Sequence, residues 1–117
     1  MTPSSFELHV TLPGEARFVP ALDDVVQHAA AYAGCDPTEA TAFCRVVLDV
    51  VAVCCRQRSG GLVDVVVRRE EGPLEVLVEC EADLSALATS QGRTTITCTH
   101  AAGRSRCRIA HVLLDSR

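Results

Sequence analysis

The chain has 117 residues, of which 48% are hydrophobic and 22% are charged, and its formal net charge is −4. These proportions are typical of a single globular domain and argue against a disordered chain. The negative net charge argues against nucleic acid as a partner, because neutralising phosphates requires a basic face.

The cellular location is predicted from what the sequence lacks. No apolar segment reaches the roughly 18–20 residues of a membrane span, since Arg45 and Asp49 interrupt the longest one. The first residues, MTPSSFELHV, show neither the basic region nor the apolar stretch of a signal peptide. We therefore expect a cytoplasmic protein that makes no membrane contact and whose seven cysteines are reduced.

The chain is predicted to begin with a strand and a helix. Hydrophobic and polar residues alternate over 6–12, which is the pattern of a half-buried strand. A helix follows over about 18–33, where hydrophobic residues recur at helical spacing. Pro20 suits the first turn of this helix, and Gly34 is placed to end it.

A second, longer helix is predicted to run from residue 37 to residue 56 or 57. Asp36 is a suitable N-cap, Pro37 is the first helical residue, and Glu39 stands at the third position of a capping box. Its hydrophobic residues form two neighbouring stripes, which comprise Phe43, Val47, Val50 and Cys54, and Cys44, Leu48, Val51 and Cys55. A third stripe, of Arg45, Asp49, Ala52 and Arg56, is polar and predicts an exposed ridge on which Asp49 can pair with Arg45.

The second half of the chain is predicted to consist of strands. Residues 62–69 and 74–81 form one expected hairpin, and residues 93–100 and 106–115 form another. The segment 83–92 between them is a short connection with room for one helical turn.

The order of one strand, two helices and four strands predicts an α+β fold in a single domain spanning 1–117. We expect a two-layer sandwich in which both long helices pack on one face of a mixed or antiparallel five-stranded sheet. The alternating residues Arg104, Arg106 and Arg108 then lie on one side of the last strand. They predict a solvated strand face, or else a charged guard on the sheet edge or a contact for an acidic partner.

Taken together, the chain resembles the anti-sigma factor serine kinases of the RsbW and SpoIIAB type, small members of the GHKL (histidine-kinase-like) ATPase superfamily. The segments that carry the resemblance are FELHVTLPGEARFVPALDDVV (6–26), GCDPTEATAFCRVVLDVVAVCCRQ (34–57) and the two strands that follow. The resemblance implies the histidine-kinase-like ATPase fold. In the family the second helix carries a box similar to E-x-x-x-N-x-x-x-H, whose Glu orients a water or acts as a base and whose Asn coordinates magnesium.

This chain departs from the family at that box. With Asp49 on the Glu position, Val53 falls on the Asn position and Gln57 on the His position. A shift by one residue gives Val50 and Cys54 instead. Neither register supplies the oxygen ligand that magnesium demands, and the chain contains no asparagine.

The adenine loop and the nucleotide lid of the family also have no counterpart. The family motif D-x-G-x-G is replaced by ECEADLSALATSQG (79–92), in which Glu81 or Asp83 can hold the acidic position but no glycine follows before Gly92. The segment that carries the lid has shrunk to about ten residues. Phosphoryl transfer depends on positioning and on metal-assisted charge stabilisation, so these losses should abolish it.

The resemblance and its gaps together predict a non-catalytic, regulatory protein-binding module without a cofactor or a metal. Its partner by analogy is a sigma factor, an anti-sigma antagonist or a second copy of the chain, with no role for nucleic acid. The relic of the nucleotide pocket is expected at Asp49, Val53, Cys54, Glu81 and Asp83. One alternative is a nucleotide-binding serine kinase with an aberrant pocket, in which Asp49 and Asp83 do the work.

Another alternative is a thiol- or metal-based sensor in the last hairpin. Pairing of its strands about AAGRS sets Cys98 opposite Cys107 on one face, where a disulfide or half of a metal site is conceivable. His100 and His111 extend this to a zinc hypothesis, although the spacing C-x-H-x6-C-x3-H matches no established structural zinc pattern. Core packing is the simpler interpretation of the two cysteines.

Overall fold

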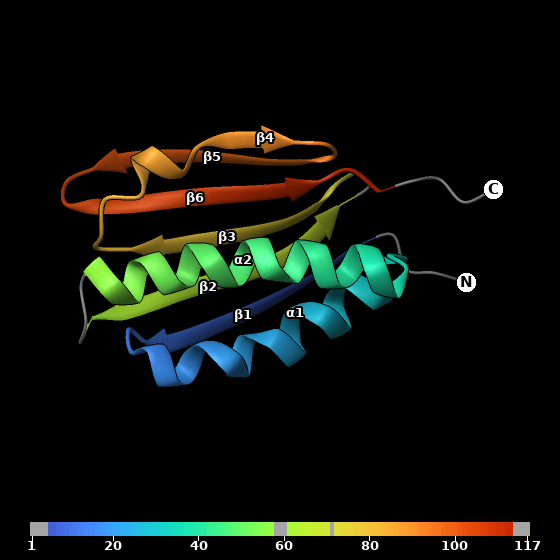
Figure 1. Cartoon of the computed structure of the whole chain (residues 1–117), viewed down its shortest axis with the longest axis horizontal. Coiled ribbons are helices and arrows are strands. Elements are labelled where there is room, and N and C mark those ends of the chain that lie inside the picture. The colour runs from blue at the N-terminus through green and yellow to red at the C-terminus, as the bar shows by residue number, and fades with distance from the viewer. Residues whose placement is uncertain (1–4, 58–60, 71, 114–117) are drawn as a thin grey trace.

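The computed structural model describes residues 5–57, 61–70 and 72–113 (Figure 1). In chain order the elements are β1 (Ser5–Pro13), the short helix η1 (Ala16–Phe18), α1 (Val19–Ala33), α2 (Pro37–Gln57), β2 (Leu62–Glu70), β3 (Leu74–Cys80), the short helix η2 (Ser85–Leu87), β4 (Thr89–Gln91), β5 (Thr94–Ala101) and β6 (Arg104–His111). The predicted strands and long helices all form, with bounds close to those expected. Residues 114 and 115 of the last predicted strand, and residues 58–60 beyond the second helix, lie outside the described residues.

The α+β architecture with both long helices against one sheet is confirmed, but the predicted number of five strands is wrong. The sheet has six strands in the order β1-β2-β3-β6-β5-β4, and every neighbouring pair is antiparallel. The additional strand, β4, follows the predicted helical turn η2 and pairs with β5 through Thr89–Ile96, Ser90–Thr95 and Gln91–Thr94. Three residues are too short to show an alternating pattern, so β4 is set by its partner strand.

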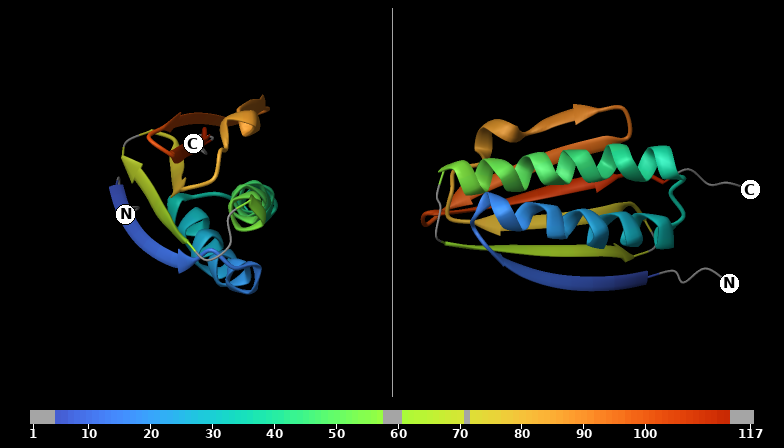
Figure 2. Two further views of the ribbon diagram at one scale, coloured as in Figure 1. Left: turned by 90° about the vertical axis from the view of Figure 1, so that its left-hand side faces the viewer. Right: turned by 60° about the horizontal axis from the view of Figure 1, so that its bottom comes forward.

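The sheet curves around the two helices, which lie side by side on its concave face (Figure 2). Helix α1 packs against β2, and α2 packs against α1 and β3. No helix within the described residues is long and apolar enough to cross a membrane.

The two helices are joined by a tight connection that the sequence predicted. Gly34 ends α1 with φ of 106°, a left-handed conformation that favours glycine. The backbone N–H of Glu39 then donates to Oδ1 of Asp36 at 2.8 Å, so Asp36 is the N-cap of α2. In a capping box the Glu39 side chain would accept from the backbone N–H of Asp36. Here the Glu39 carboxylate instead contacts Arg93 and His111.

The core lies between the helices and the concave face of the sheet. Both predicted hydrophobic stripes of α2 face it, and of their eight residues only Leu48 is less than fully buried. The sheet contributes Val63, Val65, Val67, Leu74, Val76, Val78, Cys107 and Ile109. With aromatic residues at 3% of the chain, this core consists mainly of valine, leucine, alanine and cysteine.

The opposite face of the sheet carries the arginines of β6. Glu79 accepts from Arg104 at 3.3 Å and from Arg106 at 3.0 Å, while Glu75 bridges Arg68 and Arg108. The predicted solvated strand face is therefore present, and its arginines are paired with carboxylates of the chain itself. Since β6 lies between β3 and β5, these residues do not guard an edge.

Candidate functional site

Two adjoining cavities form a groove between α2 and the β4–β5 side of the sheet. One has a volume of about 410 Å³ and the other about 300 Å³, and both are lined by Val46, Thr89 and Ile96. We call the larger cavity the polar end of the groove and the smaller one the apolar end.

The apolar end is lined mainly by hydrophobic side chains. Besides the three shared residues it is lined by Asp49, Val50, Ala52, Val53, Arg56 and Leu87. Asp49 is the only carboxylate among the described residues of this lining, and it makes no ion pair with Arg45. A single carboxylate among aliphatic side chains offers magnesium few of the oxygen ligands it requires.

The predicted relic residues do not form one site. Asp49 and Val53 line the apolar end, but Cys54 is buried in the core, where its Sγ accepts from Sγ of Cys80 at 2.9 Å. Glu81 and Asp83 are exposed and do not line the groove. The backbone N–H of Asp83 instead donates to the side chain of Gln57, which ties the β3–η2 connection to the end of α2.

The polar end of the groove carries a hydrogen-bonded cluster that the sequence analysis missed. Oε2 of Glu39 lies 2.7 Å from Nε2 of His111 and 2.7 Å from Nη2 of Arg93. The other ring nitrogen of His111, Nδ1, lies 2.8 Å from Oγ1 of Thr94. His111 is only 6% exposed, and its ring packs against Phe43 with a centroid distance of 5.5 Å.

One more potential ligand belongs to this cluster. Sγ of Cys35, a carboxylate oxygen of Glu39 and a ring nitrogen of His111 all lie within 4.8 Å of one another. Burial, followed by the charges of Glu39 and Asp36, raises the pKa of Cys35 to about 11, so its thiol is protonated at neutral pH. Among the described residues these three form the only group of histidine, cysteine and carboxylate side chains close enough to bind one metal ion.

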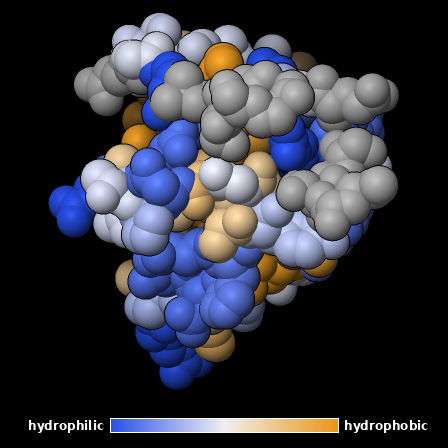
Figure 3. All heavy atoms as spheres, turned by 90° about the vertical axis from the view of Figure 1, so that its right-hand side faces the viewer, coloured by the Kyte–Doolittle hydropathy of each residue, from blue (hydrophilic) through white to orange (hydrophobic). Residues whose placement is uncertain are grey.

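The cluster lies where the α1–α2 connection, the first turn of α2 and the end of β6 meet, at the right-hand end of the molecule in Figure 1. Where the described residues form the surface at this end, it is mostly hydrophilic, with small hydrophobic areas between the polar side chains (Figure 3). Glu39 and His111 are separated by 72 residues, so no local sequence pattern joins them. In the sequence Glu39 is a capping residue and His111 belongs to a hairpin.

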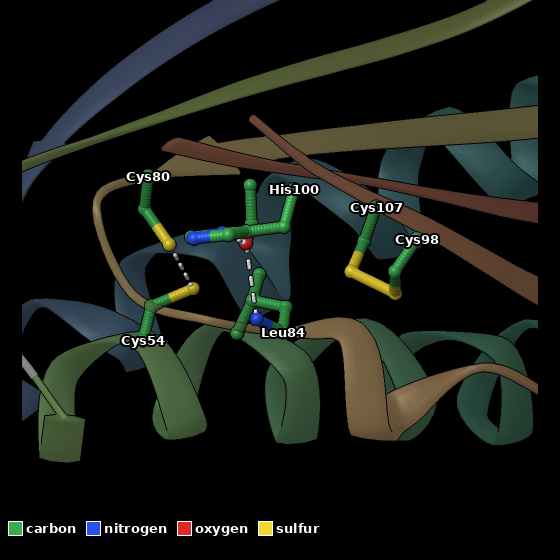
Figure 4. Close-up of a disulfide and its surroundings, with 7 residues drawn as sticks. Cys54, Cys80, Leu84, Cys98, His100 and Cys107 are labelled. Atoms are coloured by element: carbon green, nitrogen blue, oxygen red, sulfur yellow. Dashed lines mark hydrogen bonds between the residues drawn. A yellow bond between two sulfur atoms is a disulfide. The ribbon is translucent and has the colours of Figure 1, made fainter. Parts of the chain in front are cut away.

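The sulfur chemistry of the last hairpin also differs from the expectation. Cys98 and Cys107 are opposite each other as predicted, and they form a disulfide, so the expectation of seven reduced cysteines is wrong (Figure 4). The remaining cysteines, Cys35, Cys44, Cys54, Cys55 and Cys80, are free and buried. The sequence showed the register of the two cysteines, but the bond depends on their close approach in the folded hairpin.

The four residues of the zinc hypothesis are not brought together. His100 pairs with Ser105 and His111 with Thr94, at opposite ends of the β5–β6 hairpin. The hydroxyl of Ser105 meets Nδ1 of His100 at 2.7 Å and accepts from the backbone N–H of Leu84 at 3.0 Å. His100 therefore helps to anchor the β3–η2 connection.

A second pair of sulfur atoms lies near this disulfide, between α2 and β3 (Figure 4). The hydrogen bond between the two thiols raises the pKa of Cys54 and lowers that of Cys80, while burial opposes ionisation of both thiols. This pair belongs to the core.

Comparison with family models and curated proteins found no relative of the chain. No protein-family model matches the chain, and no curated protein matches it.

Proposed function

We propose that the chain is a cytoplasmic, non-catalytic regulatory module that binds a protein partner in the groove along α2. The observation that carries the proposal is the lining of the apolar end, which is mostly aliphatic and carries only Asp49 and Arg56 as charged residues among those the structure describes. Such a surface suits an amphipathic segment whose apolar residues pack on Val46, Val53 and Leu87. By the resemblance to anti-sigma factor kinases, the partner is a sigma factor, an anti-sigma antagonist or a second copy of the chain.

The groove is poorly equipped for a nucleotide, which supports the non-catalytic part of the proposal. Phosphate sites in proteins use backbone N–H groups of glycine-rich loops or of helix N-termini that point at the phosphates. The described lining of the groove contains no glycine. The N-terminus of α2 does line the polar end, but there the carboxylate of Asp36 already accepts from the backbone N–H of Glu39, and Glu39 adds a second negative charge. The position equivalent to the family's magnesium ligand is Val53, which has no oxygen to offer.

Thermal denaturation with and without Mg-ATP tests this part directly. A ligand that binds only the folded chain raises the midpoint of unfolding by mass action. We expect no shift with millimolar Mg-ATP. A rise of several degrees, abolished by Asp49→Ala, would instead favour the nucleotide-binding serine kinase with an aberrant pocket.

Partner capture tests the binding part. The full chain serves as bait in extract of the native cell, beside Val53→Glu, which places a charge in the apolar end, and Thr41→Glu as control. Thr41 is an exposed residue of α2 that does not line the groove. We expect a sigma factor or an antagonist to be retained by the wild type and by Thr41→Glu but not by Val53→Glu, and sedimentation of the same variants tests self-association. Equal capture by all three would exclude the groove as the binding surface.

The disulfide favours a second candidate function, a thiol-based sensor. Disulfides are rare in the cytoplasm and serve there mostly in catalysis or redox sensing. Cys98 is partly buried whereas Cys107 is completely buried, so the Cys98 side of the disulfide lies nearer to solvent. If the hairpin is a sensor, reduction should change the capture of the partner by at least severalfold in the wild type and not in Cys98→Ser.

A further inference from the structure

Three segments of the chain meet beside the polar end of the groove, and each contributes one side chain able to bind a metal. Cys35 lies in the connection between α1 and α2, Glu39 in the first turn of α2, and His111 at the end of β6. The connection is fixed by the N-cap of α2 and by the bond from the backbone N–H of Cys35 to Ala30 O at 3.0 Å. The backbone therefore holds the first two ligand positions in place.

We propose that Cys35, Glu39 and His111 form a binding site for a zinc ion. Thiolate, imidazole and carboxylate are the three ligand types of zinc, whereas magnesium and calcium bind oxygen. Ligand atoms about 2.1 Å from a tetrahedral ion lie roughly 3.4 Å apart. Here Sγ of Cys35, a carboxylate oxygen of Glu39 and a ring nitrogen of His111 all lie within 4.8 Å of one another, so side-chain adjustments of about 1 Å bring them to that spacing.

The surroundings orient the histidine for this role. Zinc-binding histidines use one ring nitrogen for the metal and fix the ring through a hydrogen bond at the other. Thr94 occupies Nδ1 of His111 at 2.8 Å, which leaves Nε2 facing Glu39 and the site. Cys35 and His111 are 8% and 6% exposed, so bulk water competes weakly for the ion.

Arg93 is the nearest cation, and it shapes the site in two ways. Its guanidinium contacts Oε2 of Glu39, but a carboxylate has a second oxygen that remains available to the metal. Its positive charge disfavours a further cation, while the carboxylate and the thiolate formed on binding balance the charge of zinc. The proton released by Cys35 makes zinc binding stronger at higher pH.

Three protein ligands leave the fourth tetrahedral position open. Glu39 and His111 both line the cavity of about 410 Å³, so this position faces the polar end of the groove. A water molecule is the fourth ligand in the free protein. Such an open position distinguishes this site from a closed structural zinc site. The inference stands independently of the proposed partner binding.

Titration with Co²⁺, a spectroscopic substitute for zinc, tests the proposal on the full chain under conditions that keep the free thiols reduced. We expect one equivalent to bind with the charge-transfer absorption of a thiolate ligand, and zinc to displace it. His111→Gln and Glu39→Gln should each weaken binding at least roughly 100-fold, and Thr94→Val roughly 10- to 100-fold. Cys55→Ser is the matched control for Cys35→Ser, because Cys55 is 7% exposed and lies outside the cluster.

A second experiment needs no variant and therefore does not depend on a variant folding. It measures how zinc protects individual thiols of the wild-type chain from alkylation. The wild-type chain is alkylated with and without zinc, and the modified cysteines are identified by peptide mapping. Zinc should protect Cys35 while leaving the alkylation of Cys44 and Cys55 unchanged. Absence of Co²⁺ binding to the wild type, protection of Cys54 and Cys80 in place of Cys35, or equal loss in Cys55→Ser and Cys35→Ser would each overturn the proposal.

Discussion

At the scale of single residues, Phe43 connects the interior to the groove. It is the largest fully buried side chain, with 1% exposure, and its ring contacts His111 at the polar end of the groove. Phe43 is the only phenylalanine, tyrosine or tryptophan among the buried hydrophobic residues that the structure describes. The shape of the groove and the stability of the chain therefore depend on the same residue.

Replacing this ring measures that dependence. Phe43→Ala should lower the free energy of unfolding by about 3–5 kcal/mol, because it removes buried apolar area and leaves a cavity. The loss is a large part of the roughly 5–15 kcal/mol that stabilises a domain. Urea unfolding measures it, with Val112→Ala as control at a side chain that is 57% exposed. A loss below about 1 kcal/mol would show that the surrounding side chains close the cavity.

Ala102 is the one described residue other than glycine with positive φ, at 55°. Ala102 and Gly103, which has φ of 77°, form the two-residue turn of the β5–β6 hairpin. Two-residue turns with positive φ at both positions favour Asn followed by Gly. Ala102→Asn should raise the free energy of unfolding by about 0.5–1 kcal/mol, since asparagine tolerates this conformation better than alanine. Urea unfolding checks this. The same change at Ala101, a strand residue paired with Arg104, should give no gain.

At the scale of elements, the β5–β6 hairpin is fixed twice, by its turn and by the disulfide. The bond closes a sequence separation of nine residues, and Cys107 is completely buried while Cys98 is partly exposed. The hairpin also carries Thr94 and His111 at one end and Ser105 at the other, so its geometry supports both the polar end of the groove and the β3–η2 connection.

Reduction of the disulfide should destabilise the chain by no more than about 2–3 kcal/mol, the loop-entropy value for a loop of this length. The ladder of backbone hydrogen bonds keeps the strands paired, so the fold should persist. Urea unfolding with and without dithiothreitol measures the change, and Cys98→Ser should be insensitive to the reductant. Complete unfolding on reduction would mean that the hairpin does not form without the bond.

At the scale of the whole molecule, the two faces of the sheet have different roles. The concave face is covered by α1 and α2 and holds the core. The opposite face carries ion pairs that connect β2, β3 and β6 through Glu75 and Glu79. Because these charges are satisfied within the chain, the groove is the more suitable surface for a partner.

The ion pairs on this face predict a dependence of stability on pH. Hydrogen bonds and charges from Arg106 and Arg104 lower the pKa of Glu79 below its ordinary value of 4.5. The stabilisation by the ionised Glu79 is therefore complete above about pH 4.5. It is lost as the pH falls through the lower pKa that Glu79 has in the folded state. Since the groups are largely exposed, we expect less than about 1 kcal/mol.

Urea unfolding between about pH 3 and pH 7 measures this dependence. Glu79→Gln should flatten the curve over the acidic range, with Glu70→Gln as control at an exposed residue of β2. Identical acidic limbs for wild type and Glu79→Gln would show that these ion pairs do not contribute to stability.

By itself the sequence determined the elements and the side of each that faces the core. The helix bounds follow from Gly34, Asp36 and Pro37 and from the helical spacing of hydrophobic residues, which are local properties. Strand alternation and the short turn likewise determine that Cys98 stands opposite Cys107. The tertiary structure alone decided that β4 forms, that Asp49 and Val53 line a groove while Cys54 enters the core, and that Glu39 meets Arg93 and His111. These contacts join residues far apart in the chain, and packing of α2 against the sheet, which no local pattern encodes, brings them together.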